Sequence, residues 1–356
     1  MVEILALLAV LLSGAGLFSY LTLKKTRRNR KLQESGAKSQ RDQKYCFIIN
    51  PSKKNAQQHE KTIATVCEEE GIKNFYFKYT TIEHPGNQQA VDAVSEGADV
   101  VVACGGDGTI RSVCCGIVKS GLDTSLVDVG VIPLGTGNVL AHNIHLPLGD
   151  TAAATKVAVY AKSRAFDIGM CNRKEDNGFE HAFTVIAGVG FDANMVVNTN
   201  QTAKKIVGPL AYYAAGVREG FRKKPTVEME VVAADSKVTR ATTKLRTVMV
   251  GNCGRIPGFN LIPGAQYNDG ILDVAAVDTT AGLLGWMQLG ADVTLQNFGL
   301  KTKSKYKIGR IDHIQAKSVH LKIDSEQSVQ LDGDIIGQTT DVEFRIIKNA
   351  VNLRFL

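Results

Sequence analysis

The sequence predicts an α/β domain with a mostly parallel sheet, then a β-rich, antiparallel domain, with one transmembrane helix in front of both. Three observations support this fold class. Strand-like runs alternate with helical patterns up to residue 163, strands dominate from residue 164 on, and an uncharged apolar stretch opens the chain. The length of 356 residues is enough for two domains, and 44% hydrophobic with 22% charged residues is the usual balance of a folded protein.

The stretch 4–23 is apolar or small throughout and carries no charge. At about 1.5 Å per residue it would extend ~30 Å, the thickness of the hydrocarbon core of a bilayer. A secretory signal carries its positive charge in front, whereas here the basic residues follow: Lys24, Lys25, Arg27, Arg28, Arg30 and Lys31. The positive-inside rule then places the remaining chain in the cytoplasm.

We therefore predict a membrane anchor with a basic flank over 1–31, which would also attract anionic lipids, and a linker over 32–43. The expected localisation is the cytoplasmic membrane, single-pass, with the folded domains in the cytoplasm. A buried helix of a soluble protein and a cleaved signal are the alternatives.

The formal net charge of +7 is partly a local feature of this basic flank. No zinc-finger or RNA-binding signature accompanies it, so we expect no nucleic-acid partner. The seven cysteines are odd in number and follow neither a disulfide framework nor a metal-ligand spacing. They predict buried free thiols in a reducing environment. A homo-oligomer is neither indicated nor excluded.

The first domain, 44–163, is predicted from short apolar runs that alternate with helical spacing. The strands are expected at 45–49, 74–80, 99–104 and 127–132. Helices are expected at 57–70 and 87–95, and after each of two glycine-rich segments, 105–109 and 135–138. Strands alternating with helices are typical of a parallel sheet.

The second domain, 164–347, is predicted from a series of strands with few helices between them. The expected strands are 165–170, 182–187, 226–232, 247–251, 272–277, 319–323, 328–331 and 342–347. Two helices interrupt them, at 204–222 and 281–297. The apolar faces of both helices predict core packing. Alternatively, the first could be an amphipathic helix near a lipid entrance, and the second could line an acyl channel.

Two glycine-rich segments carry the chemistry. Residues 105–109, Gly-Gly-Asp-Gly-Thr, follow a buried valine-rich strand and open a helix, whose free N–H groups suit a phosphate. Residues 135–138, Gly-Thr-Gly-Asn, follow the next strand in the same way. Ligands of open α/β sheets bind outside the carboxyl ends of the strands, so both segments predict one nucleotide cleft. Neither is a Walker A motif, because no Gly-Lys-Ser/Thr follows.

Six motifs in this order resemble the diacylglycerol-kinase catalytic superfamily, which includes bacterial lipid kinases and sphingosine and ceramide kinases. Besides the two glycine-rich segments they are Asn-Pro-Ser at 50–52, Gly-Val-Gly-Phe-Asp-Ala at 188–193, the pair 263–265 and 268–274, and Asp-Gly-Asp at 332–334. The resemblance covers about residues 44 to 356. Two positions depart from the family pattern: Lys53 stands in place of a glycine, and Asp334 in place of a glutamate.

The resemblance implies a two-domain lipid kinase with ATP between the domains, a lipid substrate such as diacylglycerol, and a role in phospholipid biosynthesis. It also implies that the last strand, within 348–356, returns to the first domain. It assigns ATP binding to Asn50, Gly105, Gly106, Gly108, Thr109, Gly135, Thr136, Gly137 and Asn138. It makes Asp334 the general base and implies Mg²⁺ at Asp269 and Asp273.

Phosphoryl transfer needs charge neutralisation and a carboxylate to take the hydroxyl proton. The carboxylates expected at the cleft are Asp107, Asp192 and Asp334, whereas Asp332 is either a turn residue or a direct participant. Asp269 and Asp273 could instead cap a hairpin. A shorter side chain at Asp334 could weaken catalysis.

Three other classes of protein share parts of this pattern. Residues 188–193 also match the Rossmann fingerprint of an oxidoreductase, but no second strand ending in an acidic residue follows about 20 positions later. An NAD kinase shares the Gly-Gly-Asp-Gly-Thr segment, and a membrane-tethered sensor of lipid or nucleotide could keep the fold without catalysis. His142, His145 and His181 show no catalytic or metal-binding arrangement.

Overall fold

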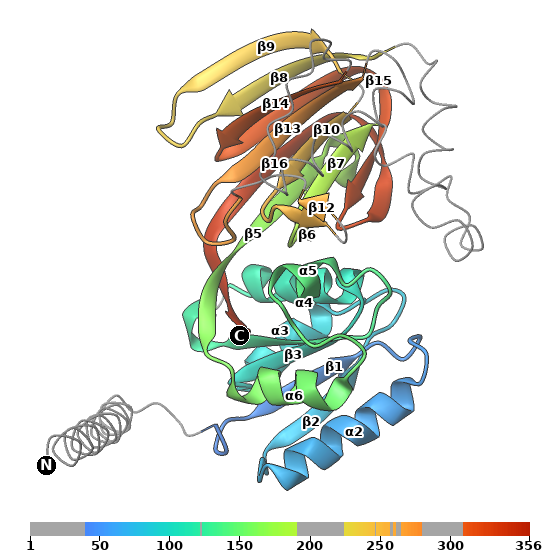
Figure 1. The fold of residues 1–356 in the computed structure, drawn as a ribbon, viewed down its shortest axis with the longest axis vertical. Coiled ribbons are helices and arrows are strands. Elements are labelled where there is room, and N and C mark those ends of the chain that lie inside the picture. The colour runs from blue at the N-terminus through green and yellow to red at the C-terminus, as the bar shows by residue number, and fades with distance from the viewer. Residues whose placement is uncertain are drawn as a thin grey trace, which may run out of the picture.

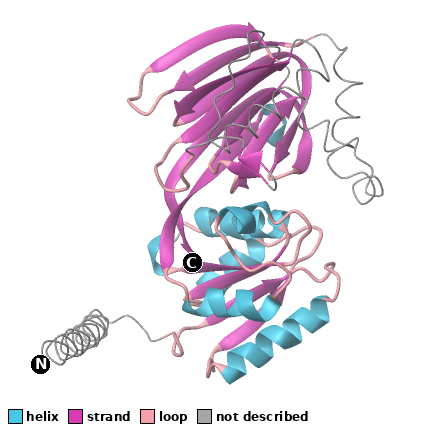
Figure 2. Cartoon of the chain, viewed as in Figure 1, coloured by secondary structure: helices cyan, strands magenta, loops and turns pink. Residues whose placement is uncertain are grey.

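The computed structural model describes residues 40–121, 123–190, 224–245, 247–256, 259–260, 265–279 and 309–356. Two domains are evident, and Figure 2 shows that the described α-helices gather in one of them while strands make up the other. The predicted combination of an α/β domain and a β-rich domain is confirmed in these residues. The predicted helices 204–222 and 281–297 lie outside them.

The sheet of the first domain has the strand order β4-β3-β1-β2, and every pairing within it is parallel. Its strands are β1 (Tyr45–Ile49), β2 (Phe75–Tyr79), β3 (Val100–Gly105) and β4 (Asp128–Pro133). Every residue of β1 and β3 is buried. A strand that is covered on both faces has a continuous run of apolar residues in its sequence. These strands could therefore be predicted from the sequence.

Among the described residues, this domain has five α-helices: α2 (Ala56–Glu69), α3 (Asn87–Ser95), α4 (Asp107–Lys119), α5 (Val139–Asn143) and α6 (Thr151–Tyr160). Helices α2 and α6 cover one face of the sheet, and α3 and α4 cover the other (Figure 1). Alternate residues of β1 divide between two cores. Tyr45 and Phe47 pack toward α2 and α6, whereas Cys46 and Ile48 pack toward α3 and α4.

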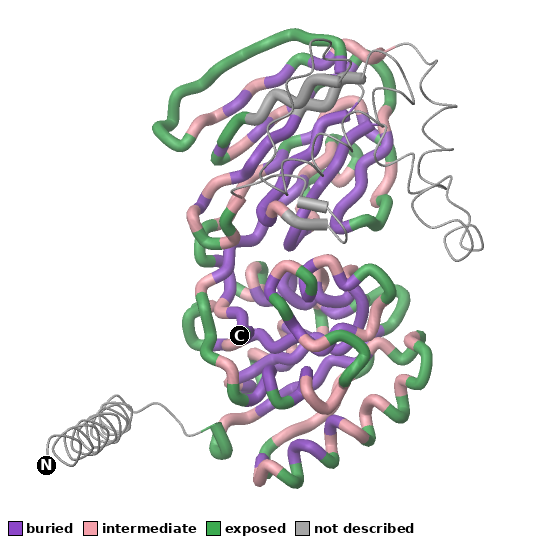
Figure 3. The backbone as a smooth tube through the Cα atoms, viewed as in Figure 1, coloured by how far each residue is buried: buried purple, intermediate pink, exposed green. Residues whose placement is uncertain are grey.

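The second domain is built from antiparallel strands. They are β5 (Ser163–Arg173), β6 (His181–Phe183), β7 (Ile186–Gly190), β8 (Thr226–Val232), β9 (Val238–Lys244), β10 (Thr247–Gly251), β13 (Leu272–Thr279), β14 (Gly309–Ala316), β15 (Ser318–Leu331) and β16 (Asp334–Arg354). A separate hairpin joins β11 (Arg255–Ile256) to β12 (Phe259–Asn260), and short 3₁₀ turns lie at Thr124–Leu126 and Lys174–Asp176. Figure 3 shows buried backbone running through both domains.

Strands β5 and β16 join the two domains. They pair antiparallel along most of their length and run from the β-rich domain into the α/β domain, where the C-terminus lies (Figure 1). There Asn352 and Leu353 pair in parallel with Asp128 and Val129 of β4. Fourteen of the described strands therefore form one hydrogen-bonded sheet.

Arg354 fixes this end of β16 in the first domain. The residue is 3% exposed, and its side chain donates to Asp128 and to the carbonyls of Ala158 and Val159 at 2.8, 3.1 and 2.8 Å. Its Nη2 also donates to Gln43. The guanidinium therefore satisfies carbonyls at the end of α6 that the helix itself leaves unpaired.

Several predicted strand limits need correction. The strand predicted at 182–187 is two strands, β6 and β7, interrupted at Thr184 and Val185. The runs 319–323 and 328–331 are one strand, β15, with a register shift between them. Strand β9 was not predicted, because all of its residues are exposed and it has no apolar alternation.

The prediction of a single-pass membrane protein is also corrected. In the parts of the chain that the structure describes, no helix combines the length and apolar character that crossing a bilayer requires. The longest helix among them, α2, has 14 residues, whereas a span needs about 20. The stretch 4–23, on which the prediction was based, lies outside the described residues. The predicted free thiols are confirmed, since all seven cysteines are buried and unbridged.

Candidate active site

The two glycine-rich segments meet at the carboxyl ends of β3 and β4. A Cβ atom placed on Gly135 would lie 2.7 Å from Cα of Gly106, so the two backbones touch only because neither residue has a side chain. Asn138 closes the second segment: its Oδ1 accepts from Gly135 N at 3.0 Å and its Nδ2 donates to Gly135 O at 2.9 Å. Asn138 therefore shapes this loop, and Thr136 and Gly137 form its exposed tip.

Asn50 ties the end of β1 to the first segment. Its Nδ2 donates to Thr109 Oγ1 at 3.2 Å, while its Oδ1 accepts from Ser52. Thr109 is 4% exposed, and a Cβ on Gly105 would lie 2.5 Å from its Oγ1. Gly105 and Thr109 thus pack against each other beneath the loops and position them.

Asp107 is the first residue of α4 and lies between the two loops. Its Oδ1 accepts from Leu140 N at 3.4 Å, and a Cβ on Gly137 would lie 3.1 Å from its Oδ2. Burial, followed by the nearby charge of Asp332, raises the pKa of Asp107 to about 6. A carboxyl group whose pKa is raised in this way, and which lies between two glycine-rich loops, is a candidate functional group.

Asp332 is buried and fully engaged. Its Oδ2 accepts from the backbone N and the hydroxyl of Thr184 at 2.8 and 3.0 Å. Its Oδ1 accepts from the backbone N of Val185 and Ile186 at 2.8 and 3.0 Å. These bonds hold the 332–334 turn onto the break between β6 and β7. Asp332 is a structural turn residue, one of the two roles that the sequence left open.

Asp334 begins β16 and faces the first domain across the turn. Its side chain is 59% exposed, in contrast to Asp332. A Cβ on Gly108 would lie 2.8 Å from Asp334 Oδ2, so the third glycine of the 105–109 segment makes room for this carboxylate. Asp334 Oδ2 also lies 3.4 Å from Nη2 of Arg111 on α4. The structure therefore brings Asp107, Asp334 and both glycine-rich loops together.

Two basic residues at this site were not predicted from the sequence. Lys53 departs from the family motif, and its Nζ would lie 3.2 Å from a Cβ on Gly106, over the junction of the two loops. Within the described part of the chain its ammonium group has no hydrogen-bond acceptor. Arg111 lies in a helix, where sequence reasoning cannot separate it from an ordinary solvated charge.

The remaining predicted site residues lie elsewhere. Asp269 Oδ1 accepts from Ile271 N at 2.9 Å, as a residue that caps a turn does, and Asp273 is buried in β13 with Gln315 3.3 Å from its Oδ1. Among the residues with described side chains, no cluster of three His, Cys, Asp or Glu could hold a metal ion. Their metal role stays a prediction, and Asp192 lies outside the described residues.

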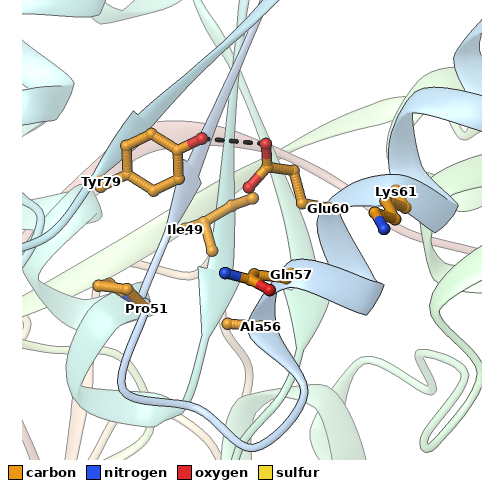
Figure 4. Close-up of a pocket in the computed structure, with 7 residues that line it drawn as sticks. All are labelled: Ile49, Pro51, Ala56, Gln57, Glu60, Lys61 and Tyr79. Carbon is orange, nitrogen blue, oxygen red and sulfur yellow. Dashed lines mark hydrogen bonds between the residues drawn. The ribbon is translucent and has the colours of Figure 1, made fainter.

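A cavity of about 460 Å³ opens beside Asn50, at the carboxyl ends of β1 and β2. Figure 4 shows its wall, with Tyr79 donating to Glu60 Oε1 at 3.0 Å across it. The lining residues are Ile49, Pro51, Ala56, Gln57, Glu60, Lys61 and Tyr79. The cavity therefore adjoins the loop that carries Lys53.

Comparison with known proteins agrees with this arrangement. The diacylglycerol kinase catalytic domain matches residues 44–171, and the YegS C-terminal NAD kinase beta sandwich-like domain matches residues 184–354. A diacylglycerol kinase of Staphylococcus saprophyticus is 28% identical over 251 residues, 70% of this chain and 75% of that protein. An uncharacterized protein of Synechocystis sp. is 26% identical over 262 residues, and the match spans 72% of this chain but only 55% of that protein.

The fold has a solved counterpart. The crystal structure of a diacylglycerol kinase from Bacillus anthracis superposes with a TM-score of 0.63 at 19% identity, covering 88% of this chain and 97% of that one. The two matched domains and the loops at their junction define a class of protein, the lipid kinases of the diacylglycerol kinase type. The chain resembles the diacylglycerol kinase catalytic-domain superfamily in both of its domains.

Proposed function

We propose that this protein transfers the γ-phosphoryl group of ATP to the hydroxyl group of a lipid, with diacylglycerol as the first candidate and phosphatidic acid as its product. One observation carries the proposal: the second domain presents the exposed carboxylate of Asp334 against Gly108, at the start of a glycine-rich loop–helix unit in the first domain. Phosphoryl transfer to an alcohol requires this pairing of a phosphate cradle with a carboxylate.

In this proposal the phosphates lie over the touching backbones of Gly106 and Gly135. The N-terminus of α4 offers them free N–H groups and its positive dipole end, and Lys53 supplies an ammonium group with no other acceptor in the described residues. Asn50, Thr109 and Asn138 hold the loops in shape. The adenine base would bind in the adjoining cavity, whose wall combines apolar and aromatic side chains with the polar Gln57, Glu60 and Lys61.

Asp334 is assigned as the general base because it is exposed at the cleft and its carboxylate is not enclosed by hydrogen bonds. Asp332 is unsuited to this role, since both of its oxygens already accept two hydrogen bonds each. The lipid hydroxyl would donate its proton to Asp334 as its oxygen attacks the phosphorus atom. Proton transfer of this kind contributes about 100- to 10,000-fold to a rate.

A magnesium ion fits the oxygen ligands of this cleft. Mg²⁺ in kinases is usually held by one or two carboxylates together with the phosphates of the nucleotide. Asp107 lies between the loops and would serve as such a ligand in its ionised form. The bound ion would neutralise charge on the transferred phosphoryl group.

The decisive experiment incubates the protein with labelled ATP and Mg²⁺ and a panel of acceptors in detergent micelles. Diacylglycerol, phosphatidylglycerol, a sphingoid base and NAD are the informative members. A labelled lipid that co-migrates with phosphatidic acid is the expected product. Labelling of NAD alone would favour an NAD kinase, a reading that the name of the second matched domain also suggests. Lipid binding without any ATP consumption would favour a sensor.

A further inference from the structure

Arg111 contacts both ends of the turn that carries the catalytic carboxylate. It lies on α4 of the first domain, one helical turn after Asp107. Its Nη1 donates to the carbonyl of Leu331, and its Nη2 lies 3.4 Å from Asp334 Oδ2. The side chain is only 15% exposed, so the guanidinium is fixed between the two domains.

The far side of the same turn is anchored differently. Asp332 accepts four hydrogen bonds from Thr184, Val185 and Ile186, which fixes the turn within the second domain. Those bonds do not reach the first domain, where the phosphate loops lie. Arg111 connects the turn to the first domain. Its planar guanidinium group can donate to a carbonyl and a carboxylate at the same time.

We propose that Arg111 is a positioning residue, which sets the distance and orientation of Asp334 relative to the phosphate loops. This inference rests on the proposed kinase function and assigns that reaction a residue in addition to its base. Arg111 would act through Asp334 and would not touch ATP. A misplacement of a catalytic group by about 1 Å can cost roughly 100-fold in rate, so the expected effect falls on kcat.

The kinetic test compares Arg111→Met and Arg111→Lys with the wild type on the lipid that the wild type phosphorylates. Arg111→Met should lower kcat by about 10- to 100-fold and leave the KM for ATP within about twofold. Arg111→Lys keeps the charge but loses the fork, and should recover part of the rate. The control is Arg240→Met, which removes an exposed arginine paired with Glu230 on the β8–β9 hairpin. Unchanged kcat in Arg111→Met would overturn the inference.

A double variant tests whether Arg111 acts through Asp334. If it does, Arg111→Met should cause little further loss in a protein that already carries Asp334→Asn. Losses that multiply would show an independent role and would overturn the inference.

A structural readout keeps the inference testable without turnover. Spin labels are attached to Ser95→Cys and Ser325→Cys, which are exposed positions, one in each domain. The seven native thiols are buried, so only the two new cysteines should react with the label. The distance between the two labels then reports the distance between the domains. Arg111→Met should broaden or shift the distance distribution, and Arg240→Met should not. If the wild type phosphorylates no acceptor, the proposed function fails, but the distance measurement still tests whether Arg111 positions the turn. An unchanged distance distribution in Arg111→Met would overturn the positioning role of Arg111.

Discussion

The carboxylate of Asp332 accepts both the backbone N–H and the hydroxyl of Thr184, at 2.8 and 3.0 Å, although the two residues are 148 positions apart in the sequence. The contact joins the turn between β15 and β16 to the gap between β6 and β7. Asp334, two positions later, is exposed. The two aspartates of one short motif therefore have different roles, which substitution should separate.

Asp332→Ala should destabilise the protein and inactivate it together. The substitution leaves buried donors at Thr184, Val185 and Ile186 without an acceptor, and each unsatisfied group costs about 1–3 kcal/mol. Urea unfolding should show a loss of several kcal/mol. An unchanged unfolding midpoint would contradict the structural role.

Asp334→Asn should lower kcat by about 100-fold or more, because the amide cannot accept the proton of the lipid hydroxyl. The KM for ATP and the melting temperature should stay close to the wild type, since the side chain is 59% exposed. Asp334→Glu keeps the carboxylate and should retain activity. If the Asn variant keeps more than about a tenth of the rate, another group removes the proton.

Asp107→Asn should abolish activity and yet stabilise the protein at neutral pH. The folded-state pKa of Asp107 is raised to about 6, so ionisation weakens the fold as pH rises through that value. The Asn variant avoids this cost, which is on the order of 2–3 kcal/mol. Unfolding should show the advantage at about pH 8 and its disappearance below about pH 4. A stability difference independent of pH would contradict the assignment.

Lys53→Met should raise the KM for ATP by about 10-fold or more, because a charge-assisted hydrogen bond to phosphate contributes about 1.5–3 kcal/mol. Stability should change little, since the ammonium has no acceptor within the described residues. The matched control is Lys54→Met, the neighbouring exposed lysine. Equal effects of the two substitutions on KM would remove Lys53 from the phosphate site.

Arg354→Met should destabilise the fold by about 3–5 kcal/mol, because it leaves the half-buried Asp128 and two buried carbonyls of α6 without their donor. Equilibrium unfolding in urea measures this change. Arg240→Met again serves as the control, since an exposed ion pair contributes about 1 kcal/mol or less. Comparable losses in the two variants would contradict the anchoring role.

The sequence predicted those parts of the fold that depend on neighbouring residues. Strand β1 and helix α3 have the limits that their apolar spacing predicted, and β8 and β10 do as well. Strand β9 escaped prediction because no side chain in it is buried. The interruption at Thr184 and Val185 escaped as well, because their backbone N–H groups bond to a residue in a distant turn.

The same distinction holds at the candidate site. The glycine-rich loops were predicted because a close approach of two backbones requires glycine, and glycine is visible in the local sequence. Whether Asp332 was a turn residue or a direct participant depended on partners far along the chain. Arg111 and Lys53 were missed for that reason: a cation in a helix or loop acquires a role only when folding brings the turn or the loop beside it.

Strand β16 begins with Asp334, beside the glycine-rich loops, and ends with Arg354 in the first domain. During synthesis on the ribosome, β4 has emerged long before Asn352 and Leu353, which pair with it. The β4 edge of the first domain's sheet therefore stays unpaired until nearly all of the second domain has been synthesised. Long-range pairing of this kind slows folding and leaves unpaired strand edges open to aggregation.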